Sequence, residues 1–348
     1  MRGRRGCGAI GIVNAAGASW LERLDHWQRR RRWAGFAVAV GKHYAEDGAA
    51  RHGARIAYYA FFSIFPLMLV FVSIVGFVLE DDIALRQEIL DSAYADMPVV
   101  GPFIRSDVGT LGGSGIALVL GIALALWAGL GVTLALGQAL DRVWNIPPVE
   151  QPGWVARRLR GLAMLVAGGL ALVASSVLGG VAASGHFEPA VATAASILLS
   201  LAVDALVLLS AFRLLTTAEP RLRELMPGVA LAAVGLLVLQ ALGGRYVEST
   251  IGRATDTYGL FATVIGLLTW LSIAAQLVLI SAELNAVRSL GLWPRSLSGP
   301  LTDPDRKALE GYARGALHDR RAMISVSWPP TAGVGEAVAV EDDPAGPD

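Results

Sequence analysis

Within the long uncharged stretches of this chain, Asp204 is the clearest side chain that could do chemistry. It lies near the middle of residues 189–212, which carry no other charge. An ionisable group in such a stretch is costly in hydrocarbon, and it usually faces a bundle interior or a water-filled cavity. Two interpretations stay open. Asp204 is either protonated and hydrogen-bonded to a neighbouring helix, or it is a carboxylate coupled to protons or to a substrate.

Other polar residues accompany the uncharged stretches. The candidate partners for Asp204, among which the sequence does not choose, are Thr133, Gln138, Gln240 and Gln276. Glu283 and Asn285 close the last uncharged stretch. No arginine follows Glu283 at the three- or four-residue spacing that brings helical side chains together. We therefore expect an ion pair from Glu283 to another helix, with Arg142 or Arg213 as the partner.

The first uncharged stretch combines a pair of tyrosines with a proline. Tyr58 and Tyr59 stand at its start, where aromatic rings commonly line a membrane interface. Each could instead form a hydrogen bond inward, and the sequence leaves both interpretations open. Pro66 removes one backbone hydrogen bond and clashes with the carbonyl of Phe62, so we predict a kink or a break in the helix there.

These residues must be positioned by helices that cross a membrane. Hydrophobic residues make up 54% of the chain and charged residues only 17%, whereas about a quarter of residues are charged in soluble domains. Each uncharged stretch reaches the roughly 20 residues needed to cross the hydrocarbon core. The sequence predicts an all-α, polytopic bundle of six transmembrane helices. The stretches are 56–79, 108–140, 161–187, 189–212, 225–244 and 257–282.

Arginine and lysine are distributed unevenly between the predicted loops. Of the 29 basic residues, 25 fall on the segments of one side and 4 on the other. Basic loops stay in the cytoplasm during insertion. We therefore predict a multi-pass protein of the bacterial cytoplasmic (inner) membrane with both termini in the cytoplasm.

The chain divides into four parts. Aromatic residues with Arg29 to Arg32 between them predict amphipathic helices at the membrane interface, bound to anionic lipid headgroups. Nucleic acid is not an expected partner, because a basic run beside the cytoplasmic membrane face already has this explanation. The parts are a disordered basic tail at 1–18, interfacial helices at 19–55, the bundle at 56–295 and a largely disordered cytoplasmic tail at 296–348.

Metal and cofactor chemistry have little support in the sequence. Cys7 is the only cysteine, and the five histidines form no paired ligand motif. We expect no metal site, no cofactor and no enzymatic activity. Small residues are dense between 116 and 183, where they let helix backbones approach closely, and they leave a homo-oligomer open.

Two motifs resemble those of the YihY/BrkB membrane protein family. The first is the run from Ala57 to Leu67, which holds the Tyr-Tyr pair and a Phe-Pro pair. The second begins at Tyr258-Gly259 and closes with the Ala-Glu-Leu-Asn-Ala run at 282–286. The resemblance covers roughly 35–295. Departures from the family pattern are Thr216 for a proline, Ser272 for a tyrosine and Ser281 for a glycine.

Members of this family were once called ribonuclease BN, so the resemblance raises the question of nuclease activity. Metal-dependent cleavage of RNA needs clustered ligands that activate water, and the sequence shows neither a His-x-His pair nor a soluble domain to hold them. We therefore expect no ribonuclease. The favoured hypothesis is a transporter or flippase-like protein for a lipid or small amphipathic substrate. The alternative is a membrane scaffold or regulatory protein that binds a partner through its basic N-terminal helix.

Overall fold

The computed structural model describes residues 15–78, 115–183, 189–246, 260–298 and 300–328. Within these ranges the chain forms helices and no strand, which confirms the all-α prediction. The sequence also predicts a short amphipathic helix at 83–95, and these residues lie outside the described part of the chain. The helices are α1 (Ala15–Arg30), α2 (Arg32–Glu46), α3 (Ala49–Val78), α6 (Gly115–Val143), α7 (Trp154–Ala183), α8 (Pro189–Leu214), α9 (Leu222–Tyr246), α11 (Leu260–Leu290) and α12 (Asp303–Gly315).

Six of these helices are long and apolar enough to cross a membrane, which confirms the predicted six-span bundle. They are α3, α6, α7, α8, α9 and α11, and each has between 25 and 31 residues. Large apolar side chains such as Trp127, Leu170 and Phe261 are exposed along them. A bilayer covers such surfaces, and helices suit it because they satisfy their own backbone hydrogen bonds.

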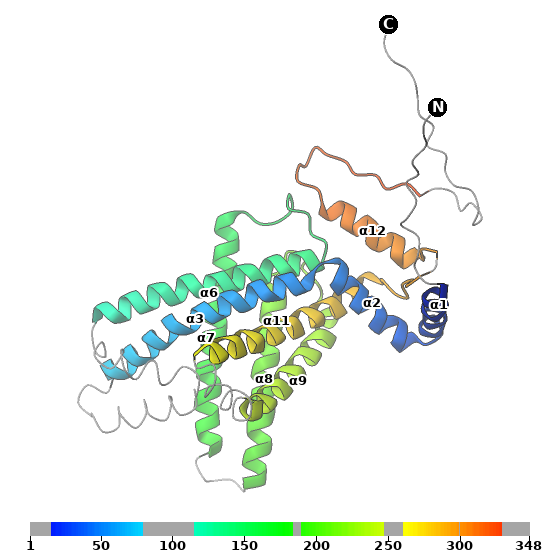
Figure 1. Ribbon diagram of the computed structural model, residues 1–348. Helices are drawn as coiled ribbons and strands as arrows, with labels where there is room; N and C mark the ends of the chain where they lie inside the picture. Colours follow the sequence, from blue (N-terminus) through cyan, green and yellow to red (C-terminus); the bar gives the residue numbers. More distant parts are fainter. Residues whose placement is uncertain (1–14, 79–114, 184–188, 247–259, 299, 329–348) are drawn as a thin grey trace, which may run out of the picture.

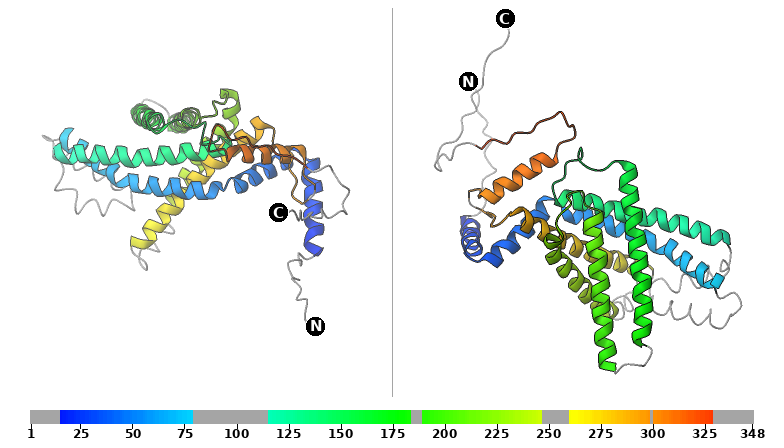
Figure 2. Two further views of the ribbon diagram at one scale, coloured as in Figure 1. Left: turned by 90° about the horizontal axis from the view of Figure 1, so that it is seen from above. Right: turned by 180° about the vertical axis from the view of Figure 1, so that it is seen from behind.

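The six spans pack on one another in a closed ring of neighbours, in which α6 also packs on α7. α3 packs on α6 and α11, α11 also packs on α9, and α8 lies between α7 and α9. Figures 1 and 2 show α7 and α8 side by side, as the short connection between them predicts, crossing the pair formed by α3 and α6. A cluster of buried apolar residues lies at the end of the bundle where α6, α8 and α11 finish and α9 begins.

Close approach of two spans depends on glycine at Gly228 in α9. A Cβ atom added there would lie 2.2 Å from the backbone oxygen of Ser281 in α11. Only a residue without a side chain lets the two helices meet at this distance. The structure therefore explains why a glycine follows Pro227 at the start of α9.

Two helices bear on the expectations of the sequence. α3 continues through Pro66 as one helix to Val78, so the proline does not break it, and the kink stays a prediction. α12 forms inside the segment that was expected to be largely disordered. The reason is a capping box, in which the hydroxyl of Thr302 accepts from the backbone N–H of Asp305 and the carboxylate of Asp305 accepts from the N–H of Thr302.

Candidate functional site

A cavity of about 560 Å³ lies between α3, α6 and the start of α7. It opens toward the surface that a bilayer covers, since Trp127 is 72% exposed and Tyr58 is 55% exposed. Arg158 is the one charged residue of its wall. The remaining wall is aromatic or aliphatic and consists of Tyr58, Tyr59, Phe62, Phe65, Pro66, Leu124, Trp127, Ala128, Leu130, Gly131 and Leu134.

The helical period of α3 aims one row of rings into this cavity. Tyr58, Phe62 and Phe65 follow one another at four and three residues, so they share a face. The rings of Tyr58 and Phe62 lie 4.7 Å apart. Tyr59 instead packs against Gly131 of α6, where a Cβ atom would lie 2.6 Å from the tyrosine ring. Both tyrosines therefore line the cavity, and Tyr59 also forms part of the contact between α3 and α6.

Arg158 stands at one end of the cavity, in the first turns of α7. Its guanidinium lies 4.2 Å from the centre of the Trp154 ring. Stacking on the ring leaves the N–H groups of Arg158 able to bind an anion, because the guanidinium donates in its own plane. The site thus combines a mostly apolar wall with one cationic side chain, that of Arg158.

Asp204 lies away from this cavity, on α8. Its Oδ2 atom is buried without a hydrogen-bond partner in the described part of the chain. Three of the four proposed partners are bonded elsewhere: Thr133 donates to the carbonyl of Leu130, Gln138 accepts from Arg55, and Gln276 accepts from Tyr44. The structure does not bring Asp204 together with the other residues selected from the sequence.

Glu283 has a different partner from those predicted. It contacts the Nδ1 atom of His43 in α2, not Arg142 or Arg213. Arg213 donates to the carbonyl of Pro220 at 2.6 Å. The sequence could not indicate this pairing, because His43 and Glu283 are 240 residues apart.

A compact buried cluster surrounds this contact. Nδ1 of His43 lies 3.2 Å from Oδ2 of Asp47, and Nε of Arg142 lies 3.6 Å from the other oxygen of Asp47. Burial is the main influence on both α2 groups, since it raises the pKa of Asp47 to about 7 and lowers the pKa of His43. Both shifts favour the uncharged forms.

Asn285 and Gln276 fix helices rather than line a cavity. The side-chain oxygen of Asn285 accepts from the N–H of Gly228 at 2.7 Å, and its amide donates to the carbonyl of Leu225 at 3.1 Å. The side chain therefore bonds the backbone on both sides of Pro227. Gln276 accepts from the hydroxyl of Tyr44 at 3.0 Å, which joins α11 to α2.

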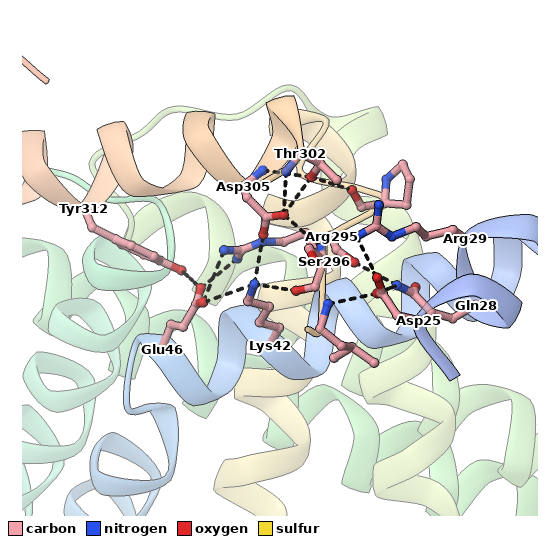
Figure 3. A network of polar contacts seen from close by, with 12 residues as sticks. Asp25, Gln28, Arg29, Lys42, Glu46, Arg295, Ser296, Thr302, Asp305 and Tyr312 are labelled. Carbon is pink, nitrogen blue, oxygen red and sulfur yellow. Dashed lines mark hydrogen bonds and ion pairs between the residues drawn. The ribbon is translucent and has the colours of Figure 1, made fainter. Parts of the chain in front are cut away.

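A polar network at this end of the bundle was not foreseen from the sequence (Figure 3). Arg295 is fully buried, and its guanidinium binds Asp305 at 2.9 Å and Glu46 at 2.7 Å. Lys42 donates to Asp305 at 2.9 Å, and Tyr312 donates to Glu46 at 2.9 Å. Burial alone would raise the pKa of Asp305, but its hydrogen bonds outweigh burial and lower that pKa far below its ordinary value. The network attaches α12 to α2.

The first helix is held by the same segment. The side-chain amide of Gln28 donates to the carbonyl of Arg295 at 2.8 Å, and Asp25 accepts from the N–H of Leu297 at 2.9 Å. Arg29 binds the other oxygen of Asp25 at 2.6 Å. For α12, the capping-box spacing from Thr302 to Asp305 was the one local signal in the sequence that could have indicated a helix.

The fold and its exposed apolar spans define a multi-pass helical membrane protein. Residues 40–298 match the family described as "Virulence factor BrkB", and because this match covers most of the chain, the protein belongs to that family. The resemblance noted in the sequence is thereby confirmed.

Three curated relatives are similar over most of their own length, and no solved structure matches. "Putative ribonuclease-like protein YfkH" of Bacillus subtilis is 25% identical over 67% of this chain and 88% of its own. "Inner membrane protein YhjD" of Escherichia coli is 26% identical over 66% and 74%. An uncharacterized protein of Dickeya dadantii is 26% identical over 70% and 80%.

Proposed function

We propose that this protein moves an anionic amphiphile, such as a lipid or a small amphipathic acid, across the inner membrane. The observation that carries the proposal is the cavity between α3 and α6, which is apolar along its wall and has Arg158 at its mouth. An acyl or aromatic tail gains free energy by leaving water for such a wall. A phosphate or carboxylate headgroup suits the planar guanidinium.

The position of Arg158 supports this orientation of the substrate. The residue lies in the first turns of α7, near the end of the span, whereas Leu124 and Phe65 lie deeper along α6 and α3. A headgroup at Arg158 would therefore stay close to the membrane surface while its tail follows the wall inward. Tyr58 adds a hydroxyl close to the mouth.

The first test uses purified protein in liposomes and fluorescent lipids with anionic or zwitterionic headgroups. Arg158→Gln is expected to slow the transfer of the anionic lipid about tenfold, since a hydrogen bond to a charged group contributes about 1.5–3 kcal/mol. Arg157→Gln is the matched control, because Arg157 is the adjacent arginine and bonds Gln151 and Pro152 outside the cavity. Equal transfer by protein-containing and empty liposomes across the whole panel would refute transport.

The second test fills the cavity. Leu124 and Leu126 are both exposed on α6, but only Leu124 belongs to the wall. Leu124→Trp is expected to slow transfer of every lipid that enters the slot, and Leu126→Trp to leave transfer unchanged. Equal effects of both substitutions would argue against the cavity as the route.

A scaffold role is the second candidate, and α1 is the observation that favours it. Trp20, Trp27 and Trp33 are exposed around this helix, and Arg31 lies 5.5 Å from the centre of the Trp27 ring. Such a surface fits anionic headgroups, as a basic interfacial helix does. Under this hypothesis, deleting residues 1–34 abolishes recovery of a partner while lipid transfer stays at the level of empty liposomes.

We do not carry the ribonuclease-like name of one relative over to this chain. His43, Asp47 and Glu283 do form a group that could hold a metal, which the sequence did not suggest. Their exposed fractions are 0%, 3% and 0%, so a phosphodiester of RNA cannot reach them in this conformation. Cleavage of tRNA by the purified protein with a divalent metal would contradict this argument.

A further inference from the structure

The contact between α2 and α11 holds a chemically distinctive set of side chains. His43 and Asp47 are four residues apart, so both face the same side at the end of α2. Glu283 reaches them from α11. One ligand atom from each of these three residues lies within 4.8 Å of the other two.

The protein groups alone leave this cluster incompletely satisfied. Oε1 of Glu283 and both carboxylate oxygens of Asp47 are buried without a hydrogen-bond partner among the described residues. Arg142 lies 3.6 Å from Asp47 and is itself 39% exposed along its side chain. Buried polar atoms almost always have partners, and a buried carboxylate needs a compensating charge. The cluster therefore has unused bonding capacity.

We propose that His43, Asp47 and Glu283 bind one divalent first-row cation of the Zn²⁺ or Mn²⁺ type. Nδ1 of His43 and Oδ2 of Asp47 are 3.2 Å apart, close to the roughly 3.4 Å between two ligands that each lie about 2.1 Å from a tetrahedral ion. An imidazole with two carboxylates favours these ions over Ca²⁺, which takes six to eight oxygen ligands.

The charges also match. A neutral imidazole and two carboxylates offset the two charges of a divalent ion, and the remaining charge beside the cluster is that of Arg142, whose side chain is 39% exposed. The ion would join α2 to α11 and thereby attach the N-terminal helices to the last span. This site is separate from the cavity between α3 and α6, whose wall contains none of the three ligands.

The experiment measures metal binding by the full-length protein in detergent, after removal of metal with a chelator. Titration with Zn²⁺ and Mn²⁺ is expected to show one saturable site per chain and a rise in melting temperature. Loss of groups that only support a ligand already costs about 10–100-fold in metal affinity. Asp47→Asn and Glu283→Gln are therefore expected to weaken binding at least tenfold.

Two substitutions serve as matched controls. Asp204→Asn makes the same chemical change at a buried carboxylate oxygen outside the cluster, and His318→Gln removes an exposed histidine. Both are expected to keep wild-type affinity. Co²⁺ supplies a second readout, because its visible absorption in the wild-type protein should disappear in His43→Gln even if that variant melts at a lower temperature.

Two results would overturn the proposal. One is wild-type protein that melts cooperatively and shows no saturable binding of either ion up to millimolar concentration, which leaves the contact as a histidine–carboxylate pair. The other is unchanged affinity in folded Asp47→Asn and Glu283→Gln. Either result leaves the transport proposal intact, since lipid transfer is measured separately.

Discussion

At the scale of single residues, the polar side chains of α11 contact groups on distant helices, while aromatic residues of α3 line the cavity. Tyr58, Tyr59 and Pro66 were selected separately, and the structure places all three in one cavity wall. Glu283 and Asn285 were also selected, yet their partners are His43 and the backbone around Gly228. Residue type reveals that a polar group needs a partner, but the identity of that partner depends on packing between distant helices.

Gly228 gives the sharpest prediction at this scale. We expect Gly228→Ala to destabilise the protein by about 1–3 kcal/mol, because the added methyl group would overlap the backbone of α11. Gly168→Ala is the control, since a Cβ atom there meets nothing within 4 Å. Thermal unfolding in detergent should show a lower midpoint for the first variant only. A drop of equal size in both would mean that helix packing is not the cause.

At the scale of helices, local patterns were sufficient for the spans. A run of apolar residues long enough to cross a bilayer is a property of neighbours in the sequence, so all six spans were predicted. α12 was missed because it is short and polar, and because contacts with α2 add to the stability that its capping box provides. Hydropathy carries no information about such contacts.

Asp305 should make the attachment of α12 depend on pH. Its pKa is lowered in the folded protein, so its contribution to stability is fully present above the unfolded value of about 3.9 and is lost as pH falls below it. Asp305→Asn is expected to destabilise the protein by roughly 2 kcal/mol at pH 7. The melting temperatures of variant and wild type should draw closer between pH 5 and pH 3, and should converge only as the pH falls through the lowered folded-state pKa of Asp305.

The control for this prediction is Asp303→Asn, which alters an exposed carboxylate in the same first turn of α12. It should leave the melting temperature nearly unchanged at both pH values. A gap between Asp305→Asn and wild type that stays constant from pH 7 to pH 3 would show that the charge of Asp305 does not stabilise α12.

At the scale of the whole molecule, the arrangement of the spans was beyond the reach of the sequence. The sequence left Asp204 either hydrogen-bonded to a neighbouring helix or coupled to protons or a substrate, and the structure places its helix, α8, between α7 and α9. The candidate cavity instead lies between α3 and α6. Each apolar helix looks alike in composition, so hydropathy does not decide which helices become neighbours.

The orientation of the molecule in the membrane is still a prediction, and the distribution of basic residues makes it testable. In a Cys7→Ala background, a cysteine at Ser92 lies in the connection between α3 and α6, and a cysteine at Ala322 follows α12. If both termini are cytoplasmic, an impermeant maleimide should label only the first in spheroplasts and both after lysis. Labelling of position 322 alone in spheroplasts would reverse the orientation.

The polar network has a consequence for how the protein is made. Gln28 bonds a residue 267 positions later, Lys42 one 263 positions later and His43 one 240 positions later. A ribosome that has released α1 and α2 has therefore not yet synthesised the groups that hold them. α1 and α2 therefore lack most of their final contacts until nearly the whole chain has been translated and inserted.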